Sequence, residues 1–206
     1  MMPRAATRLA GFVIALGLLA RAPATTIEPP GFDSLVEQSP QVVRAVVTAV
    51  SAEWRAVPGD AAQRVIKSRI TLEVRDVIKG TAPRSLVIEA LGGRIGDEEM
   101  RIEGAPELKV GQESILFLNG IERAYTPLTG LMHGYYPVRR DKRTGADYVL
   151  RSNGKPLYSE QDVALPLAAS SALLARNPHA PGMTVAEITA KIRSSASAAT
   201  LRAKQH

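Results

Sequence analysis

The chain has 206 residues, of which 45% are hydrophobic and 22% are charged, a composition typical of a single globular domain. It contains no cysteine, which excludes disulfides, thiolate metal ligands, cysteine nucleophiles and lipid attachment at a cysteine. The formal net charge of +6 falls to +3 without residues 1–24, and the remaining basic residues are interleaved with acidic ones, so we expect no nucleic-acid binding.

Residues 1–24 are predicted to be a signal peptide of the Sec type. Arg4 and Arg8 precede an uncharged run of twelve residues, LAGFVIALGLLA, which Arg21 ends. A transmembrane helix needs about 20 apolar residues, so this run fits the hydrophobic region of a signal better than an uncleaved anchor, the alternative. Small residues at positions 22 and 24 favour cleavage after Ala24. We therefore expect a periplasmic or extracellular protein with no membrane span in its mature form.

Residues 25–40 are predicted to form an extended leader and a short helix. The leader contains two prolines and a glycine, which disfavour regular structure. Asp33 or Ser34 is the expected cap of the helix, and Leu35 and Val36 are expected to face inward.

Residues 41–158 are predicted to form a β domain. The expected strands are Gln41–Ser51, Ser68–Ile78, Leu86–Leu91, a weaker one at Met100–Glu103, Ser114–Leu118, and a hairpin of Tyr135–Arg140 and Ala146–Arg151. The first is apolar on both faces, as a central strand requires, with Val42 and Val50 on one face and Val43 and Val47 on the other. In the second strand, Val77 and Ile78 are both apolar and break the alternation, which indicates a β-bulge or strong coiling just before Lys79.

Residues 159–193 are predicted to be a C-terminal helical segment. Thr184 and Glu187 have the spacing of a capping box, and three apolar residues that follow lie on one helical face: Val185, Ile188 and Ile192. The remaining residues, 194–206, are rich in serine, alanine and basic residues, and we expect them to be a disordered tail.

These elements favour a mainly β fold, a small OB-like antiparallel barrel, closed or partly closed, with a C-terminal helix. The segments VVRAVVTAV, ITLEVRDVIKG, LVIEALGG, GAPELKVGQESILFL and GLMHGYYPV, in this order, resemble secreted bacterial proteins of unknown function. Their barrel is similar to that of the tissue-inhibitor-of-metalloproteinase and netrin-like group. The resemblance covers residues 41–150. In that inhibitor family an N-terminal cysteine chelates the zinc of the target, and this chain has no cysteine to do so.

No group of residues in the sequence specifies a reaction, a metal site or a cofactor. His133 is the one histidine expected within the folded core region, but no H-x-H or H-E-x-x-H spacing occurs, and we interpret it as structural. The G-x-S-x-G motif of serine hydrolases is absent. Residues 92–96 and the acidic residues 97–99 are interpreted as a hairpin loop and a solvated turn.

One group of residues is a candidate surface for a protein partner: Tyr125, Met132, His133, Tyr135 and Tyr136. The alternative for these residues is the core, because half of the residues in an alternating strand point inward. The leading hypothesis is an exported, non-catalytic module that binds a protein, such as a secreted or periplasmic peptidase. The alternatives are an envelope-structural or assembly accessory protein and an unrecognised hydrolase that uses His133. The sequence does not specify an oligomeric state.

Overall fold

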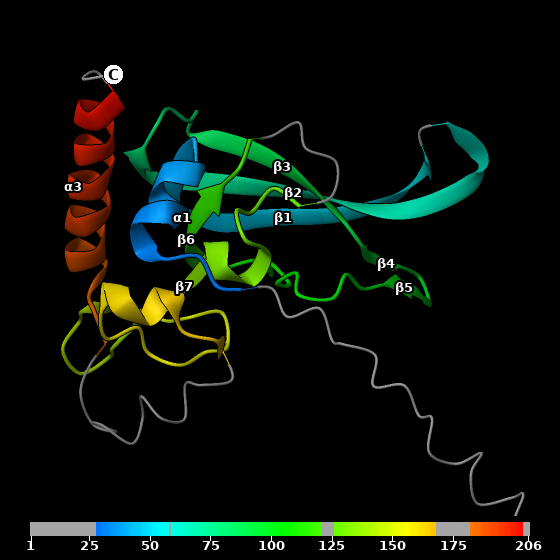
Figure 1. The fold of residues 1–206 in the computed structure, drawn as a ribbon. Coiled ribbons are helices and arrows are strands. Elements are labelled where there is room, and N and C mark those ends of the chain that lie inside the picture. The colour runs from blue at the N-terminus through cyan, green and yellow to red at the C-terminus, as the bar shows by residue number, and fades with distance from the viewer. Residues whose placement is uncertain (1–27, 58, 121–125, 168–181, 204–206) are drawn as a thin grey trace, which may run out of the picture.

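The computed structural model describes residues 28–57, 59–120, 126–167 and 182–203 (Figure 1). The predicted signal peptide and Tyr125 lie outside these residues. The strands are β1 (Gln41–Val57), β2 (Asp60–Lys79), β3 (Ser85–Leu91), β4 (Gly93–Ile95), β5 (Glu98–Met100), β6 (Glu113–Leu118), β7 (Tyr135–Arg140) and β8 (Asp147–Val149). The helices are α1 (Phe32–Gln38) and α3 (Val185–Ala203), with short 3-10 helices η1 (Leu131–Gly134) and η2 (Glu160–Ala164).

The fold is mainly β with a C-terminal helix, as predicted. Six of the described strands form one antiparallel sheet in the order β3-β2-β1-β6-β7-β8, and β4 and β5 form a separate hairpin. The two end strands, β3 and β8, do not pair with each other, so the described sheet is not closed. None of the described helices is long and apolar enough to cross a membrane.

The hairpin of β1 and β2 is much longer than its sequence pattern predicts. We call its outer part, residues 49–57 and 59–69, the arm, and Figure 1 shows it curving away from the rest of the molecule. Pairing continues along the arm to Val57 and Asp60, and the Arg64 guanidinium lies 5.4 Å from the centre of the Trp54 ring. The predicted bulge is confirmed, because two neighbours in β1 pair with Lys79 and Val77 and leave Ile78 as an extra residue.

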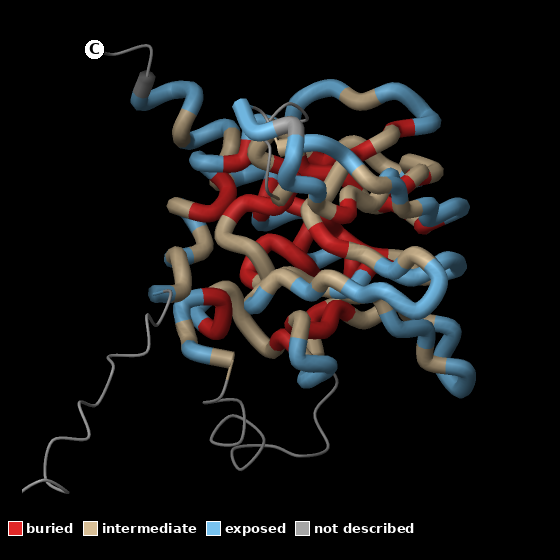
Figure 2. The backbone as a smooth tube through the Cα atoms, turned by 90° about the vertical axis from the view of Figure 1, so that its right-hand side faces the viewer, coloured by how far each residue is buried: buried red, intermediate tan, exposed pale blue. Residues whose placement is uncertain are grey.

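Two separate cores form, one on each face of the sheet, and Figure 2 shows the buried residues gathered in the middle of the molecule. The helix-side core combines strand residues with the inner faces of α1 and α3: Leu35, Val36, Val42, Ile78, Ile115, Phe117, Tyr136, Val149, Leu157, Val163, Met183, Val185, Ile188 and Ile192. The opposite-face core contains Val43, Ala45, Val47, Ile70, Leu72, Leu86, Ile88, Leu108, Leu116, Leu118, Leu128 and Tyr135. Burial of each large aliphatic side chain contributes about 1.5–3 kcal/mol.

Helix α1 buries Leu35 and Val36, as expected, but its predicted cap is wrong. The residue at the N-cap is Gly31, and no side chain caps the helix. The Asp33 carboxylate instead accepts a hydrogen bond from the Ser195 hydroxyl at 2.6 Å, and the Ser34 hydroxyl accepts one from a glutamine amide. Both candidate capping side chains are therefore used in other contacts, that of Asp33 with α3 and that of Ser34 within α1.

Helix α3 begins with the predicted capping box. The Glu187 carboxylate accepts hydrogen bonds from the Thr184 backbone at 2.7 Å and hydroxyl at 2.8 Å, and the Glu187 backbone donates to the Thr184 hydroxyl at 3.2 Å. These bonds hold the pKa of Glu187 below its usual range. The prediction of a disordered tail from residue 194 is wrong, because the helix continues to Ala203. Alanine favours helix, and the hydroxyls of Ser197 and Thr200 donate to carbonyls one turn earlier.

The predicted weak strand at Met100–Glu103 is also wrong. The strand in this region is β5, which ends at Met100 and pairs with β4 and with no other strand of the described chain. The last predicted strand is shorter than expected, since β8 covers Asp147–Val149. Its hairpin with β7 has the expected loop, in which Asp141 and Ala146 are joined by a backbone hydrogen bond of 2.8 Å.

Candidate binding cleft

Among the residues that the structure describes, the predicted partner-binding residues are not brought together on a surface. Tyr135 and Tyr136 are neighbours in β7, so their side chains point to opposite faces of the sheet. Both are buried, with 4% and 5% of their surface exposed. Tyr136 meets Phe117 edge-on in the helix-side core, with the ring centres 5.5 Å apart, and burial raises its pKa. The prediction of a tyrosine surface is therefore wrong for this pair.

Met132 and His133 lie in η1, just before β7. His133 is 8% exposed, and its backbone N–H donates to the Gly130 carbonyl at 3.0 Å. Burial, and then the positive charge of Arg151, lower the pKa of the His133 imidazole. Within the described part of the chain, no three His, Cys, Asp or Glu residues are grouped so that they could hold a metal ion.

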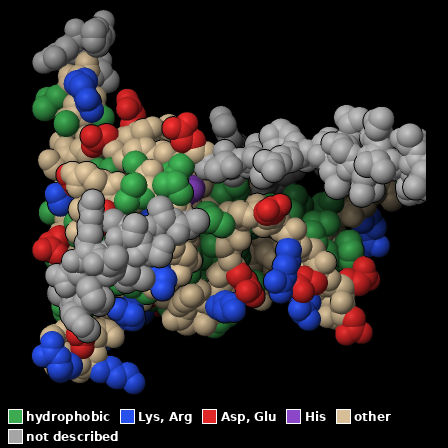
Figure 3. Space-filling model, turned by 60° about the horizontal axis from the view of Figure 1, so that its bottom comes forward, with side chains coloured by type: hydrophobic (Ala, Val, Ile, Leu, Met, Phe, Trp, Pro, Cys, Tyr) green, Lys and Arg blue, Asp and Glu red, His purple; other side chains and the backbone are tan. Residues whose placement is uncertain are grey.

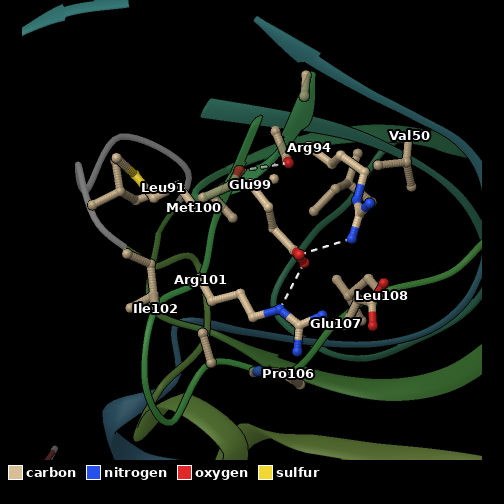
Figure 4. Close-up of a pocket in the computed structure, with 17 residues that line it drawn as sticks. Val50, Leu91, Arg94, Glu99, Met100, Arg101, Ile102, Pro106, Glu107 and Leu108 are labelled. Atoms are coloured by element: carbon tan, nitrogen blue, oxygen red, sulfur yellow. Dashed lines mark hydrogen bonds and ion pairs between the residues drawn. The ribbon is translucent and has the colours of Figure 1, made fainter. Parts of the chain in front are cut away.

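A cleft of about 470 Å³ opens where the opposite-face core reaches the arm (Figure 4). Residues from β1, β2, β3, the β4–β5 hairpin and the following segment line it: Val50, Ala52, Ser68, Ile70, Ala90, Leu91, Gly92, Gly93, Arg94, Glu99, Met100, Arg101, Ile102, Ala105, Pro106, Glu107 and Leu108. The sequence does not predict this cleft, because its walls come from segments that only the folded chain brings together.

The floor of the cleft is apolar because of a bulge in β1. The register with β2 shifts after Val47 and leaves Thr48 as an extra residue, which inverts the alternation of side chains. Val50 then lies opposite Ile70, which belongs to the opposite-face core. The expectation that Val50 shares a face with Val42 is wrong. Val50 is 41% exposed and extends the apolar surface of that core into the cleft.

Two glycines set the wall of the cleft against the arm. Gly93 has a φ of +139°, and a Cβ there would lie 2.4 Å from the Ser68 Oγ and 3.2 Å from the Ala52 Cβ. At Gly92, with a φ of +97°, a Cβ would lie 2.8 Å from the Met100 carbonyl oxygen. The Ser68 hydroxyl donates to the Gly92 carbonyl at 2.7 Å. The chain therefore turns sharply after β3 and places the β4–β5 hairpin directly over the arm.

The rim carries two arginines that share one carboxylate. Arg94 Nη2 lies 2.7 Å from one oxygen of Glu99, and Arg101 Nε lies 2.6 Å from the other (Figure 4). The hydrogen bond from Arg101, with the positive charges of both arginines, holds the pKa of Glu99 below its usual range. These three residues together carry a net charge of +1, and both guanidiniums are largely exposed. Glu107, which also lines the cleft near Arg101, is paired with Lys109 at 3.3 Å, so the lysine offsets its charge. Each guanidinium has five N–H donors, so donors remain for a ligand.

Acidic and basic side chains also lie interleaved on the right-hand part of the face shown in Figure 3, with hydrophobic side chains between them.

Comparisons with protein-family models, curated proteins and solved structures found no match. The chemistry of the cleft must therefore be inferred from its own residues. The hydroxyl among its lining residues, that of Ser68, is engaged with the Gly92 carbonyl. An apolar floor beside a cationic rim can bind an apolar group that lies next to an anionic one.

Proposed function

We propose that this protein is an exported, non-catalytic binding module that recognises a protein partner, such as a secreted or periplasmic peptidase, through the cleft beside the arm. The observation that carries the proposal is the combination of Val50, an exposed apolar side chain on the cleft floor, with the exposed arginines of the rim. Arginine is enriched in protein interfaces and in their binding hot spots, and an apolar pocket can take an apolar anchor side chain of a partner.

Export is supported by the N-terminal pattern of Arg4, Arg8 and the twelve-residue apolar run. The barrel resemblance supports a binding role, because small barrels of this kind present clefts and loops to partners. The zinc-chelating mechanism of the metalloproteinase inhibitors is not part of the proposal, because it needs the cysteine that this chain lacks.

Photocrosslinking in the envelope and culture medium of the producing cell tests this proposal. A photoreactive amino acid is placed at Val50, on the cleft floor, and in a matched variant at Leu201, which is 63% exposed near the end of α3. We expect a defined protein adduct from position 50 that Arg101→Glu weakens at least five-fold, and no such adduct from position 201.

Absence of any adduct from position 50 would count against the proposal. A defined adduct only from position 201 would instead favour the alternative of an assembly accessory protein, in which α3 docks on a neighbour. Mass spectrometry of the adducts identifies the partner in either case.

A further inference from the structure

The two edges of the six-stranded sheet differ in how their backbone groups are satisfied. Beyond β8, Val149 N–H donates to the Met183 carbonyl at 2.9 Å, and Tyr148 forms a bridge with Thr184. At the other edge, β3 pairs with β2 and with no other described strand. The β8 edge is therefore covered by the chain itself, and the β3 edge is not.

The register of β3 shows which of its groups are free. Gly92 N–H donates to the Ile66 carbonyl at one end of the β2–β3 ladder, and Val74 N–H donates to the Arg84 carbonyl at the other. Each end of the ladder is therefore closed by a hydrogen-bonded residue pair. Hydrogen-bonded pairs alternate along an antiparallel ladder, so the backbone groups of three residues between them face β2: Leu86, Ile88 and Ala90. Those of four others point outward: Ser85, Val87, Glu89 and Leu91. None of the four makes another backbone hydrogen bond within the described chain.

The β3 edge also lacks the features that usually protect a free edge. Its sequence, SLVIEAL, contains no lysine and no proline, and its register with β2 is regular, without a bulge. The one charged residue, Glu89, lies 4.0 Å from Lys67 of the neighbouring strand. An edge of this kind favours pairing with another strand.

The same edge leads directly into the cleft. Ala90 and Leu91, at the end of β3, line it, and Arg94 is the third residue after the strand ends. A strand paired with β3 would place every second side chain on the face of Ile88 and Ala90, which is the face of the apolar floor. The next side chains along this strand would reach the rim, where Arg94 and Arg101 share a single carboxylate.

We infer that the partner supplies an extended segment that pairs with the outer edge of β3, places an apolar side chain in the cleft and a carboxylate at the arginines of the rim. This inference rests on the proposed function and specifies its mode of recognition. Backbone hydrogen bonds to Val87 and Glu89 hold the segment, and the alternation of its side chains provides selectivity.

Selection from a phage-displayed library of random twelve-residue peptides against the purified protein tests the inference. We expect the selected peptides to share alternating apolar residues and at least one Asp or Glu. Methylation of every second backbone nitrogen of a selected peptide should weaken binding at least ten-fold when the methylated set faces β3, and less than three-fold when the other set is methylated. Isothermal titration calorimetry measures both.

Two protein variants and one control variant provide the matching test. Val87→Pro removes an outward N–H without removing a bond to β2, and we expect it to weaken binding at least ten-fold. Arg101→Glu should weaken binding at least five-fold, whereas Arg84→Glu, a charge reversal at an exposed arginine before β3, should leave it within two-fold. Circular dichroism checks that each variant folds. If Val87→Pro does not fold, the methylated peptides still test strand pairing on the original protein.

The possible failures separate the inference from the proposed function. Peptides that bind equally well in both methylated forms, but lose affinity with Arg101→Glu, would overturn strand addition and leave cleft binding in place. Selection of no peptide, together with no adduct from position 50, would overturn both. A dimer that sedimentation detects in the original protein and not in Val87→Pro would overturn the inference in favour of a second copy of this chain at the edge.

Discussion

The two faces of the sheet are covered to different extents. On the helix-side face, α1, α3 and η2 close over the core, and polar contacts join them: Lys191 lies 2.6 Å from Glu160, and Ser195 lies 2.6 Å from Asp33. On the opposite face, the described loop residues Leu108 and Leu128 pack on the core, and its apolar surface continues into the cleft beside the arm. The covered face stabilises the fold, whereas the open one leaves surface available for a partner.

The largest effect is expected from a buried arginine on the covered side. Arg151 is 2% exposed and donates hydrogen bonds to the carbonyls of Leu165 and Pro166 beyond η2. Arg151→Ala leaves these part-buried carbonyls without that donor and creates a cavity at the buried arginine side chain, so we expect the free energy of unfolding to fall by about 4 kcal/mol. Arg139→Ala, at an exposed residue of β7, is the control and should cost about 0.5 kcal/mol or less. Urea denaturation measures both, and similar losses would contradict this role of Arg151.

The next prediction compares the two faces directly. Ile192 is buried in the helix-side core, and Ile192→Ala should lower the free energy of unfolding by about 3 kcal/mol. Val50→Ala on the cleft floor should lower it by about 0.5 kcal/mol or less, because this side chain is already partly exposed. Val50→Ala should, however, reduce peptide binding several-fold. Equal losses of stability at the two sites would contradict the distinction between the faces.

A smaller effect is expected at the glycine that seats the β4–β5 hairpin. Gly93→Ala places a Cβ against Ser68 and Ala52 at a positive φ, so we expect a loss of about 2 kcal/mol and weaker peptide binding. The control is Gly96→Ala, which also has a positive φ but no atom within 4 Å of the added Cβ, and it should cost about 1 kcal/mol. Denaturation and titration calorimetry measure the two effects. Equal losses of unfolding free energy in the two variants would show that the contact of Gly93 with the arm does not contribute to stability.

The smallest effect is a dependence of stability on pH. Burial and the charge of Arg151 lower the pKa of His133 in the folded protein, so the unfolded chain binds a proton more readily. The contribution of the neutral imidazole is therefore fully present above pH about 6.5 and is lost as the pH falls below that value. His133→Gln should flatten the curve of unfolding free energy between pH 7.5 and 5. An unchanged slope in this variant would assign the dependence to other groups.

Local patterns predicted the elements whose residues carry strong signals. The alternation in β2 and the spacing of Thr184 and Glu187 specify a strand and a helix start by themselves, and both are confirmed. The arm carries no such pattern, because alanine and charged residues dominate it, and pairing between its two strands holds it extended. Serine and threonine have a lower helix propensity than alanine. At Ser197 and Thr200 this lower propensity is outweighed by the helix that precedes them, and their hydroxyls donate to its carbonyls.

The candidate site was beyond prediction for a related reason. The cleft depends on the extra residue Thr48, which inverts the alternation in β1, and no local signal marks that bulge. The tyrosine surface, in contrast, could have been rejected from the sequence, because Tyr135 and Tyr136 are adjacent in a strand and must face opposite ways. Backbone register, rather than residue type, decided both outcomes.

The chain has one tryptophan, and the cation–π contact of Trp54 with Arg64 places it on the arm. It lies on the same face of β1 as Val50 and Ala52, beyond the cleft. Tryptophan fluorescence therefore reports on the arm, whereas far-ultraviolet ellipticity at the helical minimum reports mainly on α3, the longest described helix. Denaturation followed by the two signals shows whether the arm melts together with the body or before it.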